Sequence, residues 1–131
     1  MGTSIYKGGT LKYYSIDQNV LVTSNSYKYS NGYFGENSPS TGHRTRNIAS
    51  SDNLKTATDF YNKIALGGKE KIISDNLKVT SMADGSRISF RVKSVSDGTP
   101  VVEINITKST CTGGVKHQKI HFIRSDDWWK K

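Results

Sequence analysis

Three segments in the C-terminal half decide the fold: residues 87–93 read RISFRVK, residues 101–107 read VVEINIT, and residues 117–124 read HQKIHFIR. Apolar and polar side chains alternate in each segment, as they do in a strand with one buried and one exposed face. Turn-forming residues precede the segments, at 83–86, at 96–100 and around 113–114. The sequence therefore predicts three successive antiparallel strands that bury one face and present polar groups on the other.

A helix is predicted upstream of these strands. Ser51 or Asp52 can cap its N-terminus, apolar residues recur at helical spacing from Leu54 to Ala65, and glycines at 67–68 end it. Residues 77–82 form a weaker extended segment between this helix and the strands. The predicted fold class is α+β, with an N-terminal helical and irregular region followed by an antiparallel β-sheet.

The first 50 residues differ in composition from the rest. They hold six of the seven tyrosines among many Ser, Asn and Gly residues. Residues 11–14 and 19–23 favour strands, and residues 30–48, which contain Gly, Pro and few apolar anchors, are expected to form a long surface loop. Tyrosines next to lysines here can stack unpaired bases, but packing in strands and the core is the favoured interpretation. We divide the chain into an N-terminal subregion, 1–50, and a core, 51–131.

Charge and cysteine content narrow the classes of function. The chain has 131 residues, 19 Lys and Arg against 11 Asp and Glu, and a net charge of +8, which suits a polyanionic partner such as nucleic acid or an anionic membrane. No apolar run is long enough to span a bilayer, and the first residues lack a secretory signal. The single cysteine, Cys111, excludes an internal disulfide. His117 and His121 are too far apart along a strand to chelate one ion easily, so no metal or other cofactor is expected.

The polar face of the three strands combines cations with an acid/base pair, formed by Arg87, Arg91, Lys93, Glu103, Asn105, Thr107, Lys119 and His121. Metal-free RNA cleavage needs a base for the 2′-hydroxyl, an acid for the leaving 5′ oxygen and cations for the phosphate. His121 is the leading acid/base candidate because imidazole titrates near neutral pH, and Glu103 is the second. Arg91 with Lys93 or Lys119 would hold the phosphate.

Further RNA contacts are predicted at Arg87 and His117 on this face, and at Arg44 and Arg46 beside His43. Individually, such residues more often form solvated cross-strand pairs, which contribute little energy. Only the convergence of cations and acid/base groups on one face favours a function.

Several short motifs, in this order, resemble the C-terminal toxin domains of bacterial polymorphic and contact-dependent inhibition systems. They are TATDFYNKI (56–64) followed by the glycines at 67–68, DGS (84–86), RVKSVSDGTP (91–100) running into VEI (102–104), and KIHF (119–122). Domains of that kind are assigned to the barnase, EndoU, colicin and RelE fold group. In that group a curved antiparallel sheet follows helical elements, and its concave face cuts RNA, often tRNA.

The resemblance implies roles for five residues: Arg91 and Lys119 at the phosphate, Ser94 and Thr99 as substrate hydrogen-bond partners, and His121 in proton transfer. It also implies delivery from the producing bacterium as part of a larger secreted toxin, action in the target-cell cytoplasm, and a cognate acidic immunity protein. Residues 1–50 would then be a pre-toxin or cell-penetration segment, or extra strands of the same domain.

We therefore expect a metal-independent endoribonuclease toxin that cleaves RNA, with tRNA as the expected substrate, by transesterification. Two alternatives stay open: a DNase toxin that uses a divalent metal, and a non-catalytic RNA-binding module. A membrane-active toxin is disfavoured, because the sequence has no long apolar helix and no strongly amphipathic basic helix.

Overall fold

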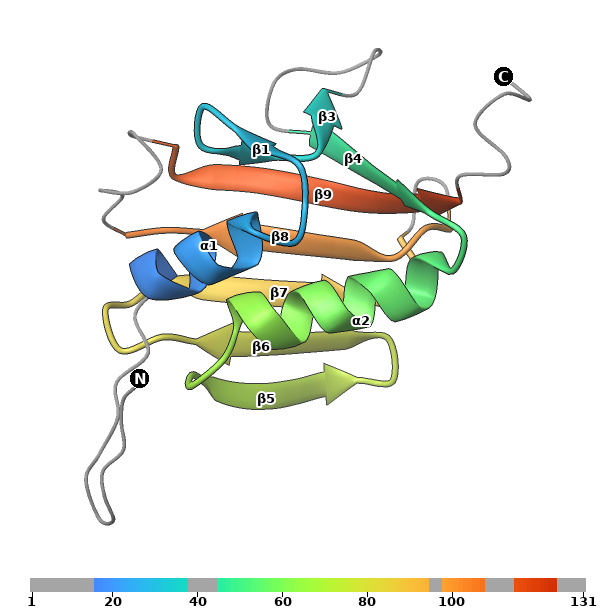
Figure 1. The fold of residues 1–131 in the computed structure, drawn as a ribbon. Helices are drawn as coiled ribbons and strands as arrows, with labels where there is room; N and C mark the ends of the chain where they lie inside the picture. Colours follow the sequence, from blue (N-terminus) through green and yellow to red (C-terminus); the bar gives the residue numbers. More distant parts are fainter. Residues whose placement is uncertain (1–15, 38–44, 95–97, 108–114, 125–131) are drawn as a thin grey trace, which may run out of the picture.

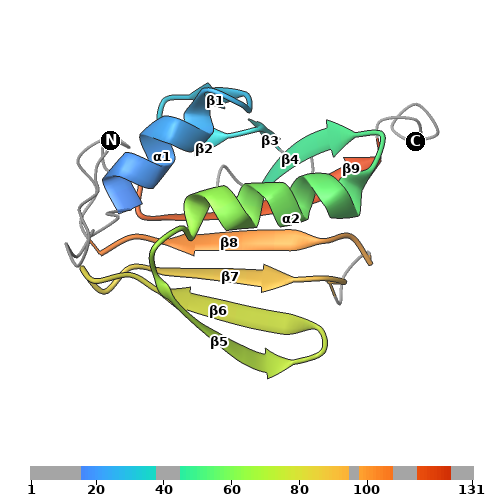
Figure 2. The ribbon, with the colours of Figure 1, turned by 60° about the horizontal axis from the view of Figure 1, so that its bottom comes forward.

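Two helices pack on one face of a seven-stranded sheet. The computed structural model describes residues 16–37, 45–94, 98–107 and 115–124. The helices are α1 (Ile16–Ser24) and α2 (Asn53–Ile64), and both lie in front of the sheet in Figure 1. A small hairpin of β1 (Tyr29–Ser30) and β2 (Tyr33–Phe34) lies on the same side of the sheet as the helices (Figure 2).

The strand order in the sheet is β3-β4-β9-β8-β7-β6-β5. The strands are β3 (Glu36–Asn37), β4 (Thr45–Ser50), β5 (Lys69–Ser74), β6 (Leu77–Ser81), β7 (Arg87–Arg91), β8 (Val101–Asn105) and β9 (His117–Arg124). Neighbours are antiparallel, except that β4 runs parallel to β9. The predicted α+β class is confirmed, and the three predicted strands are the adjacent strands β7, β8 and β9. The parallel pair makes this largely antiparallel sheet a mixed one.

Helix α2 forms where the sequence predicted it. The Asp52 side chain caps it by accepting a hydrogen bond from the backbone N–H of Lys55, at 3.2 Å. Gly67 takes a φ of +83° just beyond the C-terminus, a conformation that glycine adopts without steric cost. Four of its apolar residues are buried against the sheet: Ala57, Phe60, Tyr61 and Ile64. Leu54, which belongs to the same apolar pattern, is 45% exposed.

Phe60 is at the centre of the core. Its ring lies 5.1 Å from that of Tyr27, 5.0 Å from that of Phe34 and 5.4 Å from that of Phe122. These contacts join α2 to β9 and to the hairpin of residues 29–34, so residues before and after position 50 build one core. Tyr27 and Tyr29 pack against this core, as the packing interpretation predicts.

The strand predicted at residues 19–23 is wrong, because these residues belong to α1. The run of β-branched residues favours a strand, but Ile16, Asn19, Val20 and Thr23 are buried at helical spacing. The Asn19 amide also donates to the carbonyls of residues 64 and 66, both at 2.9 Å, at the C-terminal end of α2. Docking of α1 on α2 therefore outweighs local strand propensity. The strand predicted at residues 11–14 lies outside the described residues.

The long surface loop predicted at residues 30–48 is also wrong where the structure describes it. Residues 29–37 and 45–50 form four strands, and Phe34 is fully buried. Its backbone N–H donates to Oε1 of Gln118 at 2.9 Å, and the Gln118 amide donates to the carbonyl of Gly32 at 3.0 Å. A buried side chain of β9 thus attaches this hairpin to the sheet. Strand β5 was not predicted at all, since all six of its residues are exposed and its pattern has no buried face.

Neither helix of the described residues has the length and apolar character needed to cross a membrane.

Candidate active site

The predicted polar groups lie on the side of the sheet opposite the helices, which we call the open face. Among the described residues, no helix covers it (Figures 1 and 2). Strand alternation and cross-strand register place on it Lys69 and Lys71 of β5, Leu77, Val79 and Ser81 of β6, Arg87, Ser89 and Arg91 of β7, Val101, Glu103 and Asn105 of β8, His117, Lys119 and His121 of β9, and Thr45 and Asn47 of β4.

Cross-strand register brings the acid/base groups next to one another. Glu103 of β8 lies opposite Lys119 of β9, and Asn105 lies opposite His117. His121 lies opposite Val101 on one side and beside Asn47 of the parallel strand β4 on the other. The open face of β9 therefore carries histidine, lysine and histidine in succession.

His117 and Glu103 are in close polar contact on the open face. The imidazole Nε2 lies 2.5 Å from the carboxylate Oε2, and the two side chains are 32% and 35% exposed. A substrate can reach the pair, and the hydrogen bond to the carboxylate orients the imidazole ring. Glu103 and His121 are the acid/base pair predicted from the sequence, but in the structure Glu103 contacts His117, which was predicted only as an RNA contact.

His121 lies two positions beyond Lys119 and is 8% exposed. Its Nδ1 and Oγ1 of Thr99 share a hydrogen bond of 2.9 Å, which orients the ring. Thr99 belongs to a turn closed by backbone bonds, since the Ser94 N–H donates to the Thr99 carbonyl at 2.8 Å and the Gly98 N–H to the Ser94 carbonyl at 3.1 Å. Thr99 therefore reaches the predicted catalytic histidine, while the buried Ser94 is part of the turn that positions Thr99.

Three predicted cations remain available on the open face. Arg87, Arg91 and Lys119 have no carboxylate partner among the described residues. Lys93 lies beyond the end of β7, where Asn76 binds its backbone N–H and carbonyl at 2.8 and 3.0 Å. Its exposed side chain belongs to the edge of this site.

Arg46, predicted as an RNA contact, lies apart from these groups. It pairs in register with Ile120, whose side chain is in the core, so it projects to the helix side of β4. Its guanidinium donates to the carbonyls of Phe34 and Gly35, both at 3.0 Å, and lies 4.9 Å from the centre of the Tyr33 ring. Burial lowers the pKa of Arg46. The structure thus gives Arg46 a structural role. Residues 43 and 44 and Cys111 lie outside the described residues.

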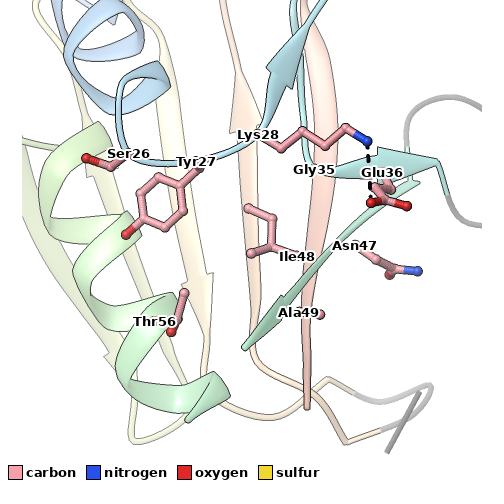
Figure 3. Close-up of a pocket in the computed structure, with 9 residues that line it drawn as sticks. All are labelled: Ser26, Tyr27, Lys28, Gly35, Glu36, Asn47, Ile48, Ala49 and Thr56. Atoms are coloured by element: carbon pink, nitrogen blue, oxygen red, sulfur yellow. Dashed lines mark ion pairs between the residues drawn. The ribbon is translucent and has the colours of Figure 1, made fainter. Parts of the chain in front are cut away.

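Asn47 belongs to the open face but was not predicted as a site residue. Figure 3 shows its side chain directed away from that of Ile48, which points toward α2. Register places Asn47 beside His121, where its amide can donate and accept hydrogen bonds. Recognising it from sequence required recognising β4, whose residues TRNIAS show no clean alternation.

A pocket of about 380 Å³ lies on the helix side of the sheet, between α2, residues 26–28 and strands β3 and β4 (Figure 3). An exposed ion pair of Lys28 and Glu36, 3.4 Å apart, closes one end. None of the predicted site residues lines this pocket.

No group of three or more His, Cys, Asp or Glu side chains lies close enough to hold a metal ion within the described part of the chain. Comparisons with protein-family models, with curated proteins and with solved structures found no match for this chain.

Proposed function

We propose that the protein is a metal-independent endoribonuclease whose active site is the open face around β9. One observation carries the proposal: Lys119 lies between two histidines on this face, and a hydrogen bond orients each ring, between His117 and Glu103 at 2.5 Å and between His121 and Thr99 at 2.9 Å. A phosphate held by Lys119 would have an acid/base group on either side.

The spacing along β9 fits this arrangement. Alternate residues of a strand are about 6.6 Å apart at Cα, so Lys119 is equally far from both histidines. Arg91 of β7 lies in the same cross-strand row as His121, with Val101 of β8 between them. It supplies a second cation for the negative charge that grows on the phosphate oxygens.

The proposed reaction is a transesterification. The base removes the proton of the 2′-hydroxyl, the 2′ oxygen attacks phosphorus, and the bond from phosphorus to the 5′ oxygen breaks. That oxygen leaves with a proton from the acid, so the products are a 2′,3′-cyclic phosphate and a 5′-hydroxyl. His117 suits the base role because its ring is accessible and is oriented by the hydrogen bond to Glu103, and this leaves His121 as the acid.

The proposal also includes a biological role for the enzyme as an antibacterial toxin. A toxin delivered by a producing bacterium would act on RNA, with tRNA the expected target, in the cytoplasm of the target cell. An acidic immunity protein that covers this face is supported by Arg87, Arg91 and Lys119, which have no carboxylate partner among the described residues. Charge complementarity speeds association and fixes partner choice. Growth arrest on expression, relieved by co-expression of an acidic neighbouring gene product, would test this setting.

Cleavage of tRNA by the purified protein, with and without EDTA, tests the enzymatic proposal. The wild type should cut in both conditions. Replacing either His117 or His121 by Gln should slow cleavage by about a hundredfold or more, the usual worth of general acid/base catalysis. Lys63→Gln, on an exposed position of α2, is the control and should cut at the wild-type rate. Unchanged cleavage in both histidine variants would remove the proposed mechanism.

A non-catalytic RNA-binding module is a second candidate, favoured by the low exposure of His121, which at 8% leaves little of the ring for a substrate. In that case the wild type would bind RNA with steep salt dependence and leave it intact.

A further inference from the structure

We propose that the RNA-binding surface extends from the active site to the far edge of the sheet, where Lys69 and Lys71 of β5 bind phosphates of the same RNA strand. This inference rests on the proposed function, because it assigns a substrate class to the same face. The substrate is a single-stranded segment several nucleotides long, and the reacting phosphate lies at β9.

The register of the sheet lines these lysines up with the active site. One row across the open face runs Lys69, Ser81, Arg87, Asn105 and His117. The parallel row one step along the strands runs Lys71, Val79, Ser89, Glu103 and Lys119. Each row thus starts at a β5 lysine and ends at an acid/base or phosphate-binding residue of β9. Strands β8, β7 and β6 lie between β9 and β5 in the sheet, as Figure 1 shows.

The length of these rows suits an oligonucleotide. Neighbouring strands are about 4.8 Å apart, so β5 lies about 19 Å from β9 across the sheet. A stacked strand rises about 3.4 Å per nucleotide and would cover this distance with roughly five or six nucleotides. In the first row, Lys69 of β5 and Arg87 of β7 are about 10 Å apart, because one strand separates theirs, and the small residue Ser81 lies between them. Small and polar side chains between cations leave room for a backbone to cross.

The charges on these rows also favour a polyanion. Lys69 and Lys71 are exposed, and neither has a carboxylate partner among the described residues. Glu70 alternates to the helix side, in register with Thr80. Glu103 is the one carboxylate of the two rows, and it is bound to His117. A strand of phosphates crossing the open face would therefore meet positive charge at both ends.

An edge strand can carry lysines for another reason, since charge and a β-bulge both discourage pairing with a second sheet. Strand β5 is an edge strand with a register shift between Ile72 and Ser74. If protection of the edge is their only function, removing the lysines would leave RNA binding unchanged apart from the general effect of net charge. The test therefore needs a control with the same net charge.

Binding of non-cleavable, fully 2′-O-methylated RNA separates this proposal from catalysis. The Lys69→Gln/Lys71→Gln variant is compared with Lys28→Gln/Lys63→Gln, which removes two exposed lysines from other parts of the structure. Each lost phosphate contact lowers the salt slope of single-strand binding by about 0.7. For an oligomer of about 12 nucleotides, the slope of log affinity against log salt concentration should therefore be smaller by about 1.4 in the β5 variant than in the wild type. A fourfold rise in salt concentration would then lower the affinity of the wild type about sevenfold more than that of the variant. A trinucleotide should bind both variants equally well.

Equal salt slopes for the β5 variant and its charge-matched control would overturn the proposal and leave edge protection as the function of these lysines. So would a wild type that binds no RNA. If only the catalytic proposal fails, the result is different. RNA would then bind along the open face with the expected salt slope, while tRNA would stay intact. The circular dichroism spectra of both variants should match that of the wild type, which shows that the substitutions leave the fold intact.

Discussion

Replacing Gln118 by Met tests how firmly the N-terminal hairpin is attached to the sheet. Gln118 is 1% exposed, its Oε1 accepts from the Phe34 N–H at 2.9 Å, and its amide donates to the Gly32 carbonyl at 3.0 Å. Methionine has a similar volume but can make neither bond. A buried donor or acceptor left unsatisfied costs about 1–3 kcal/mol, so the two groups together predict a loss of about 2–6 kcal/mol in the free energy of unfolding.

Urea denaturation measures this loss, and hydrogen exchange at the Phe34 amide reports on the same bond locally. The Met variant should show a lower midpoint and faster exchange of that amide. Asn62→Ala, at an exposed position of α2, is the control and should stay within about 0.5 kcal/mol of the wild type. A Gln118 variant as stable as this control, with the Phe34 amide still protected, would refute the attachment of the hairpin through β9.

Three further predictions concern the core and the turns. Phe60→Ala, which removes a fully buried ring in contact with three others, should cost about 3–5 kcal/mol in urea denaturation. Gly35→Ala should also destabilise the fold, by more than about 1 kcal/mol, because residue 35 has a φ of +69° and an added Cβ would lie 2.4 Å from the Asn47 carbonyl oxygen. Burial raises the pKa of Tyr61 to about 12, so the stability that its neutral form contributes is fully present below about pH 10 and is lost as the pH rises toward 12. Tyr61→Phe should flatten this alkaline decline in a pH series of unfolding curves, and an unchanged decline would contradict it.

The fold was predictable where one periodicity dominates. Helix α2 has an N-cap, an apolar stripe and a glycine stop, and β7, β8 and β9 alternate cleanly, so local sequence determines them. Helix α1 was mistaken for a strand because its burial comes from docking on α2. Strand β5 lies at the sheet edge with no buried face, so its sequence shows no burial pattern.

The sequence predicted which side of the sheet carries the site, but not which of its side chains contact one another. Alternation assigned Glu103, Lys119 and His121 to the same side of the sheet. Which histidine contacts Glu103 depends on the register of β9 against β8 and on the anchoring of Gln118 on the other face of the sheet. Neither can be read from the strand sequences. Arg46 appeared equivalent to the other cations because β4 was interpreted as a loop.

The chemical ends left on cleaved tRNA test the central claim most directly. Transesterification through the acid/base groups of β9 predicts a 2′,3′-cyclic phosphate on one fragment and a 5′-hydroxyl on the other, formed in the presence of EDTA. A single 2′-deoxy substitution at the cleaved nucleotide should abolish the cut, because the attacking oxygen is then absent. Fragments with a 5′-phosphate and a 3′-hydroxyl, or cleavage that continues at the deoxy position, would contradict the account.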